Sequence, residues 1–337
     1  MNRTRMQGLT LVELMVSMLL GLVVIGGAVS LTLANRQSYR TNEGLSQVQE
    51  SARTALELLA RDLRQAGLGG CGNDGRIGNV LNGGGGTWYA SGEGFVGFEG
   101  DEVNSVAFGT ARGERVDDTD AFQLQGVQGI GVSVDDHNVI AAGLKLTETT
   151  LGIAPGDILV VCDFDHATIF QVTNYNSSNV ELIHNSGSAG YSPGNCSKGL
   201  GYPTDCSSVN GNGYQFQRNS QVGRYSALDW YIGQSGRTVD SSRSLFRNRL
   251  GAGGVLFREE IFAGVTDMQL SYRRDDDDVF VDAVPAWGTP EWAEVNAVRV
   301  VLTVESGDAR ISTDNTVNAG RLQKVFTQVV TLRNRVP

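Results

Sequence analysis

GLTLVELMVSMLLGLVVIGGAVSLTLAN, residues 8–35, is the stretch that decides the fold. Residues 14–33 carry no charged side chain, and only two serines and one threonine interrupt their apolar residues and glycines. A helix rises about 1.5 Å per residue, so this run spans about 30 Å, the thickness of a bilayer's hydrocarbon core. A single acid, Glu13, stands at its start. The stretch therefore predicts a membrane-spanning helix with one energetically costly carboxylate at its entrance.

A short basic flank precedes this segment. Arg3 and Arg5 lie among the first eight residues, which contain no acid. Positive flanks stay in the cytoplasm, so the rest of the chain is expected to be exported. A cleaved secretory signal has a shorter apolar core followed by small residues, whereas here the small residue, Gly8, precedes the apolar run. The order predicts a short leader and a helix that the mature protein keeps.

Beyond Asn35 the sequence becomes polar but keeps helical spacing. Apolar residues recur every three or four positions, as in an amphipathic helix: Leu45, Val48, Ala52, Leu56, Leu59, Leu63 and Ala66. Charged residues fill the other positions: Arg53, Glu57, Arg61, Asp62 and Arg64. Gly67 begins a glycine-rich stretch that ends the pattern. One helix from about Leu9 to Ala66, roughly 85 Å long, is predicted.

The remaining chain has the pattern of strands and turns. Its 337 residues include 44 glycines but only 6 prolines, which indicates many tight turns and long loops. Short or alternating apolar runs predict strands at residues 102–110, 120–127, 157–163, 167–175, 179–185, 226–233, 254–274, 297–306 and 324–334. No strand–helix–strand alternation occurs, which argues against a parallel α/β sheet. We therefore predict an α+β fold, with the long helix packed on an antiparallel β-sheet body that has long glycine-rich loops.

Charge and motifs limit the function. The formal net charge is −10, whereas nucleic acid requires a basic face, so no nucleic-acid partner is expected. No G-x-S-x-G elbow or P-loop occurs, and the glycine cluster at 67–75 follows a helix instead of joining a strand to one. Neither an enzymatic activity nor a nucleotide cofactor is expected.

Four cysteines are present: Cys71, Cys162, Cys196 and Cys206. An even number in an exported chain favours two disulfides. Cys196 and Cys206 flank a short loop rich in Gly, Ser, Asn and Pro, which predicts one bridge, and Cys71 with Cys162 follows by elimination. Four free thiols or a metal site are the alternatives, although no Cys-x-x-Cys spacing of the zinc type occurs.

One acidic run has the chemistry of a weak calcium site: Asp275, Asp276, Asp277 and Asp278. It lacks the Gly and the bidentate Glu of a calcium loop, so a solvated hairpin tip is the favoured interpretation. The histidines are scattered, which favours structural or surface roles: His137, His166 and His184. No metal site is assigned, and calcium is the only cofactor left open.

The N-terminal stretch resembles a known processing signal. QGLTLVELMVSMLLG, residues 7–21, is similar to the class III signal of type IV prepilins and pseudopilins, although most members carry Phe where this chain has Leu9. The resemblance implies that a prepilin peptidase cuts after Gly8 and that Leu9 becomes an N-methylated first residue. Glu13 then becomes the fifth residue, expected to pair with the freed α-amine of a neighbouring subunit and bring the two into register. The alternative is a carboxylate that only reaches the lipid headgroups.

Further segments resemble the PilW-type minor pilins of the type IV pilus. They are SARTALELLARDLRQAGLGGCG at 51–72, PGDILVVCDFDHATIFQVT at 155–173 and VFTQVVTLRNRVP at 325–337. The resemblance implies four parts: a leader at 1–8, a transmembrane and filament-core helix at 9–34, an amphipathic helix at 35–67 that continues into the body, and a β-rich globular pilin domain at 68–337.

As a minor pilin, the chain is expected to prime pilus assembly and to lie at or near the tip in a complex with other minor pilins. A body as large as residues 68–337 is hard to repeat along a close-packed filament, which favours the tip. The implied partners are other minor pilins, the major pilin, a large tip adhesin, the prepilin peptidase and the inner-membrane assembly machinery. The protein would cross the inner membrane once, with a periplasmic body, and then join the pilus at the cell surface. A J-type pseudopilin of type II secretion and an adhesin that itself binds a surface are the alternatives.

Overall fold

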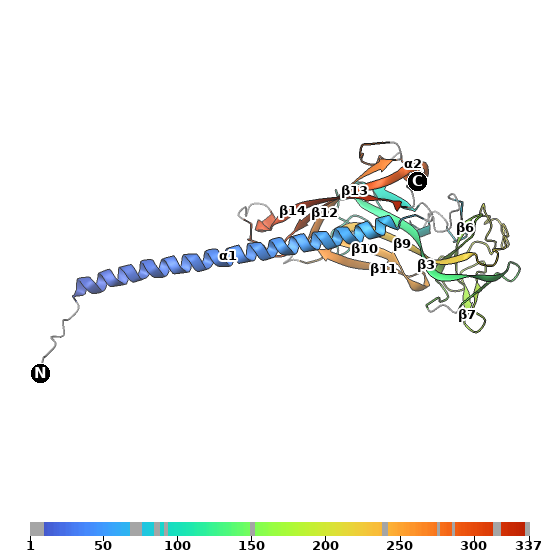
Figure 1. Ribbon diagram of the computed structural model, residues 1–337, viewed down its shortest axis with the longest axis horizontal. Coiled ribbons are helices and arrows are strands. Elements are labelled where there is room, and N and C mark those ends of the chain that lie inside the picture. The colour runs from blue at the N-terminus through green and yellow to red at the C-terminus, as the bar shows by residue number, and fades with distance from the viewer. Residues whose placement is uncertain are drawn as a thin grey trace.

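The computed structural model shows a long helical stalk with a β-rich body at one end (Figure 1). It describes residues 10–67, 76–83, 88–90, 94–148, 152–237, 242–274, 277–284, 287–312 and 318–333.

The stalk is helix α1 (Leu11–Arg64), one uninterrupted element of 54 residues and about 81 Å. Its first half projects clear of the body (Figure 1). Buried positions begin at Gly44 and then follow the apolar repeat, because only this side of the helix meets the body. The helix ends at Arg64, and three residues later Gly67 turns the chain with a φ of +108°, a conformation that glycine takes without strain. The Gly67 N–H then donates to the carbonyl of Gln125 at 2.8 Å, which joins the helix end to the larger sheet.

The C-terminal part forms a three-stranded antiparallel sheet. Its order is β12 (Val265–Arg274), β13 (Val295–Glu305) and β14 (Gln323–Thr331), and the short helix α2 (Thr289–Glu294) precedes β13. Val298, Val300 and Leu302 of β13 lie in the same hydrophobic core as the buried side of α1. The sheet and the second half of the helix therefore stabilise each other.

An eleven-stranded sheet forms the rest of the body. Its strands are β1 (Ile77–Asn79), β2 (Phe95–Phe98), β3 (Ala121–Asn138), β4 (Gly143–Leu146), β5 (Ile158–Cys162), β6 (Ala167–Gln171), β7 (Asn174–Asn176), β8 (Glu181–Ile183), β9 (Gln221–Gln234), β10 (Arg243–Leu250) and β11 (Leu256–Ala263). Three short 3-10 helices, at Trp88–Ala90, Ala252–Gly254 and Asn318–Gly320, occur among the described loops. The strand order is β1-β6-β5-β9-β3-β4-β8-β7, with β10 between β9 and β11 and with β2 on β3. Among the described pairs, only β1 with β6 is parallel.

Strands β3 and β9 connect two regions of the body. Near the stalk, Phe122 and Trp230 lie in the core shared with α1. At the other end, Val132 and Val222 belong to a second core with β4, β5, β6 and β8. We call this region, β4 to β8 with the loops between residues 139 and 220, the distal lobe. It lies beyond the C-terminal end of α1 (Figure 1).

The predicted α+β fold is confirmed, but the strand predicted at 102–110 is wrong, and β1, β2, β4 and β10 lie outside the predicted strands. Residues 102–110 form a loop with one isolated bridge, because Asn104 bends the backbone by accepting the Val106 N–H at 2.9 Å and also donates to buried Asp229. The strand β10 was missed because it has no clear apolar alternation. Its arginines instead form ion pairs with the neighbouring strand β11.

Candidate assembly site

The first half of α1 is an apolar surface without a cover in the isolated chain. Its most apolar 18-residue window has a mean hydropathy of 2.4, and none of that window is buried. Leu22, Val24 and Leu31, for example, are between 68 and 75% exposed. The helix is long and apolar enough to cross a membrane by length and composition. So much apolar area is unfavourable in water, so lipid or other apolar helices must cover it.

Glu13 caps the N-terminus of this helix together with Thr10. The Thr10 hydroxyl accepts the Glu13 N–H at 3.2 Å, and Glu13 Oε2 accepts both the Thr10 N–H at 3.1 Å and the Thr10 hydroxyl at 3.0 Å. This capping box satisfies two backbone donors that a helix start otherwise leaves free. Glu13 thus has a partner within its own chain, which the sequence interpretation missed although the T-x-x-E spacing signals it.

The predicted processing site adjoins this cap. Gly8 and Leu9 lie outside the described residues, so cleavage after Gly8 and N-methylation of Leu9 stay predictions. Thr10, whose N–H donates to Glu13, directly follows Leu9 in the sequence.

The second half of α1 is fixed to the body near its middle. The Thr41 hydroxyl donates to the carbonyl of Ile311 at 3.0 Å. Gly44 packs directly on the same residue, since a Cβ there would lie only 2.5 Å from the Ile311 Cδ1. A larger side chain at Gly44 would therefore force the buried side chain of Ile311 to shift.

A second attachment lies in the last turn of α1. Asp62, which the sequence placed among the polar positions of an amphipathic helix, is only 6% exposed, so its expected exposure was wrong. The Trp230 Nε1–H donates to Asp62 Oδ2 at 3.3 Å, and Arg61 and Arg247 contribute ion pairs at 3.3 and 3.7 Å. Burial raises the pKa of Asp62, and the two arginines oppose that rise. The stalk is thereby held to the centre of the larger sheet.

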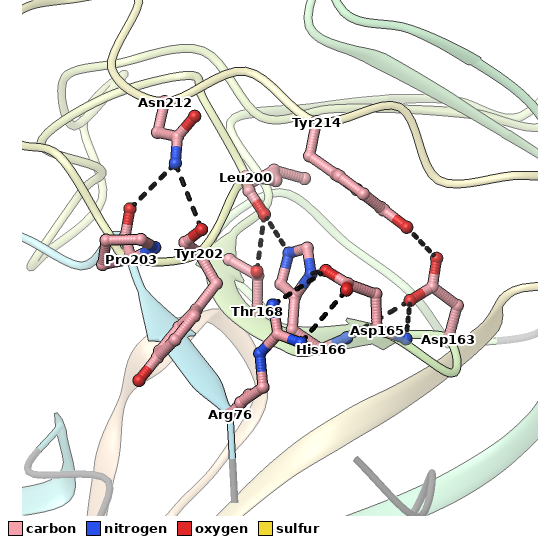
Figure 2. Close-up of polar contacts among 10 residues, drawn as sticks. All are labelled: Arg76, Asp163, Asp165, His166, Thr168, Leu200, Tyr202, Pro203, Asn212 and Tyr214. Carbon is pink, nitrogen blue, oxygen red and sulfur yellow. Dashed lines mark hydrogen bonds and ion pairs between the residues drawn. The ribbon is translucent and has the colours of Figure 1, made fainter. Parts of the chain in front are cut away.

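The distal lobe has its own polar network, drawn in Figure 2. His166 Nε2 lies 2.8 Å from the carbonyl of Leu200, and His166 Nδ1 lies 2.9 Å from Asp165. Arg76 forms an ion pair with Asp165 at 3.2 Å, and Tyr214 donates to Asp163 at 2.8 Å. These contacts fix the β5–β6 turn against the loop that contains Leu200. They give His166 a structural role.

The same loop carries the predicted disulfide. Cys196 and Cys206 are joined, which confirms the first predicted pair. Cys162 is also disulfide-bonded. Its predicted partner, Cys71, lies outside the described residues, so that pairing stays a prediction.

The remaining candidates for chemistry lie apart from α1. His137, near the end of β3, and His184, in the distal lobe, are buried with their Nε2 atoms 3.2 Å apart, and burial lowers the pKa of both. Asp277 and Asp278 are exposed, whereas Asp275 and Asp276 lie outside the described residues. Within the part of the chain that the structure describes, no three His, Cys, Asp or Glu side chains are arranged to hold a metal ion.

Two protein families match separate parts of the chain. Residues 229–334 match the model of the Type IV Pilus-assembly protein W, and residues 3–29 match the prokaryotic N-terminal methylation motif. No curated protein and no solved structure matches the chain significantly. The first match includes Trp230, which holds the end of α1, and the second includes Glu13. Together they support a type IV pilin-like minor pilin and confirm the resemblance drawn from the sequence.

Proposed function

We propose that the protein is a minor pilin that primes type IV pilus assembly and lies at or near the pilus tip with other minor pilins. One observation carries the proposal: the uncovered apolar half of α1, with Glu13 at its start, is joined firmly to a large body. The apolar helix and the methylation motif fit a pilin anchored in the inner membrane.

Helix bundling supplies the mechanism. In the membrane, lipid covers the apolar half of α1, and in a filament the corresponding helices of other subunits would cover it. A carboxylate in the apolar region costs on the order of 2.5–3.5 kcal/mol. Pairing Glu13 with the α-amine of a neighbouring mature chain offsets that cost only in one register. Several such helices would form a template on which the first major pilins assemble.

The body supports a position at the end of the fibre. The distal lobe extends past the end of α1, on the side opposite the apolar half (Figure 1). In a filament whose helices form the core, this lobe would occupy the space in which the next subunit toward the tip must pack. We therefore propose that the chain lies at the tip and has a structural and not a catalytic role. In this proposal residues 9–34 form the apolar helix, residues 35–67 the amphipathic helix and residues 68–337 the pilin domain.

Site-specific cross-linking in cells tests this proposal. A photo-reactive amino acid at Val23, which is 63% exposed on the apolar half, should capture major and minor pilins. The same group at Ser207, exposed on the distal lobe, serves as the matched control and should not capture the major pilin. Adducts at Val23 with secretion-system proteins alone would instead assign a J-type pseudopilin.

Gene deletion separates priming from adhesion. Loss of a priming subunit should abolish fibres, measured by electron microscopy of the cell surface. Loss of a subunit that only binds a surface would leave normal fibres that no longer adhere, and that result would contradict the priming role.

A further inference from the structure

A groove of about 770 Å³ lies where α1 ends on the larger sheet. Strands β3 and β9 form its floor, the last turn of α1 borders it at Arg61, and the end of β10 borders it at Leu250. The hollow lies where the strand that neighbours β9 changes from β5 to β10. On this side, β9 pairs with β5 up to Arg224 and with β10 only from Leu228 onward.

The floor continues the face of the sheet that α1 covers, but it is polar. Opposite residues of antiparallel strands share a face, and the register places Gly126 opposite Ser226 and Gln128 opposite Arg224. In β9, Ser226 and Arg224 are separated from Trp230 by an even number of positions, so their side chains lie on the same side of the sheet as Trp230. Trp230 is buried under the helix, whereas Ser226 lies beyond the helix end and lines the groove. The helix thus leaves a polar strip of the same face open.

Arginines dominate the charge of the groove. Four of them line it: Arg61, Arg224, Arg247 and Arg249. Two acids line it, Asp62 and Asp157, and both are almost fully buried. Glu259, which pairs with Arg247 and Arg249, adds a third carboxylate, so four arginines against three acids leave a small local excess of positive charge in a chain with a net charge of −10.

Two of the arginines are held in place from β10. Arg247 Nη2 donates to Glu259 Oε2 at 2.8 Å, and its guanidinium lies 5.2 Å from the centre of the Trp230 ring. Arg249 Nε donates to the other oxygen of Glu259 at 2.9 Å, and its guanidinium lies 4.6 Å from the Phe257 ring. Side chains fixed in this way lose little conformational entropy when they bind a further group.

Arg224 is fixed on the opposite side of the groove. It forms an ion pair with Asp157 at 3.3 Å and donates to the carbonyl of Gly152. The side chain is still 31% exposed, and that of Arg249 is 37% exposed. Each guanidinium has five N–H donors, so both keep donors for a ligand after these contacts are made.

We propose that this groove binds an acidic peptide segment of a partner protein. The guanidinium fork matches a carboxylate with two parallel hydrogen bonds, which favours Asp and Glu side chains as the groups recognised. Pockets that hold ligands of many atoms measure roughly 300–1,000 Å³, so the groove has room for several residues and not only for one anion. Ser226 and Gln128 on the floor offer hydrogen bonds to a peptide backbone. The assignment does not depend on the priming role.

Peptide binding to the full chain in detergent micelles tests the assignment. The probe is a fluorescein-labelled hexaglutamate, and its anisotropy reports binding; a hexaglutamine peptide of the same length is the neutral counterpart. Hexaglutamate should bind, and Arg249→Gln and Arg224→Gln should each weaken its binding about tenfold. Arg53→Gln, an exposed arginine of α1 outside the groove, is the matched control and should bind as the wild type does.

Three results would overturn the proposal. One is absence of hexaglutamate binding to a chain whose thermal unfolding is normal. Another is equal weakening by Arg53→Gln, which would indicate diffuse charge attraction. The third is complete competition by citrate at the same carboxylate concentration, which would make the groove a site for small anions. Arg249→Lys keeps the positive charge but lacks the planar guanidinium that binds a carboxylate with two hydrogen bonds. Weaker hexaglutamate binding by this variant, with normal thermal unfolding, would show that the loss comes from carboxylate recognition and not from unfolding.

Discussion

The indole N–H of Trp230 donates to the carboxylate of Asp62 at 3.3 Å, between residues that are 168 positions apart in the chain. Both side chains are buried, at the junction of the last turn of α1 and the centre of β9. Because Arg61 and Arg247 also contact Asp62, the carboxylate joins three elements: α1, β9 and β10. Any tilt of the stalk must therefore move the larger sheet with it.

We expect Asp62→Ala to lower the free energy of unfolding by about 2–4 kcal/mol, because it leaves the buried Trp230 N–H without an acceptor. Asp62→Asn keeps an acceptor oxygen and should cost less. Guanidinium unfolding of the full chain in micelles, followed by tryptophan fluorescence, measures both. Glu57→Ala removes an exposed ion pair with Arg53 and should cost below about 1 kcal/mol. An Asp62→Ala effect no larger than that of Glu57→Ala would show that the buried bond does not stabilise the junction.

The helix and most strands could be predicted because their signals are local. The apolar repeat from Val48 to Leu63 predicted which side of α1 is buried, although Leu45, assigned to the same side, is 38% exposed. The runs at 157–163 and 297–306 predicted β5 and β13. Strand β10 escaped prediction because ion pairs with β11, and not an apolar alternation, hold its outer residues.

The candidate site was predictable only in part. Glu13 stands out in sequence because it is an isolated acid in an apolar run, and so it was identified. Asp62 resembles any charged residue of an amphipathic helix, since its partner Trp230 lies far away in the chain. The groove arginines likewise come from α1, β9 and β10, so only the tertiary structure brings them together.

The disulfide of the distal lobe should stabilise its loop. Cys196 and Cys206 are ten positions apart. A bridge across such a loop lowers the entropy of the unfolded chain, which raises the free energy of unfolding by about 2–3 kcal/mol. The double variant Cys196→Ser with Cys206→Ser should therefore show faster amide hydrogen exchange around Leu200, whose carbonyl holds His166. Exchange on α1, at Leu59 for example, serves as the internal control and should not change. Equal protection near Leu200 in both proteins would contradict this prediction.

Asp120 should make stability depend on pH. Its N–H donates to the carbonyl of Met268 at 2.9 Å and its Oδ2 accepts the Leu270 N–H at 2.7 Å, where the loop before β3 meets β12. Burial raises the pKa of Asp120 to about 7. An unfolded aspartate loses its proton near pH 3.9, so between about pH 4 and 7 the native state holds a proton that the unfolded state has released. The contribution of Asp120 to stability therefore falls as pH rises through this window.

The variant Asp120→Asn keeps an acceptor for Leu270 but does not titrate. Relative to the wild type, its free energy of unfolding should rise by on the order of 2 kcal/mol between pH 5 and pH 8. Denaturant unfolding at the two pH values measures this change. Leu270→Val, which truncates a buried side chain at the same position but keeps the backbone N–H and adds no titratable group, should differ from the wild type by the same amount at both. A constant difference for Asp120→Asn would rule out the raised pKa.

Thr10 and Glu13 together distinguish two roles for the acid at the start of α1. If Glu13 acts only in the capping box, Thr10→Ala and Glu13→Ala should impair the protein similarly, each by about 1 kcal/mol of helix stability. If Glu13 pairs with the α-amine of a neighbouring subunit, Glu13→Ala should abolish pilus assembly while Thr10→Ala leaves most of it, because the carboxylate is still present. Counting fibres by electron microscopy, with immunoblots that compare processing and membrane insertion, measures the difference. Equal numbers of fibres in the two variants would assign Glu13 to its own helix and remove the proposed pairing from the assembly mechanism.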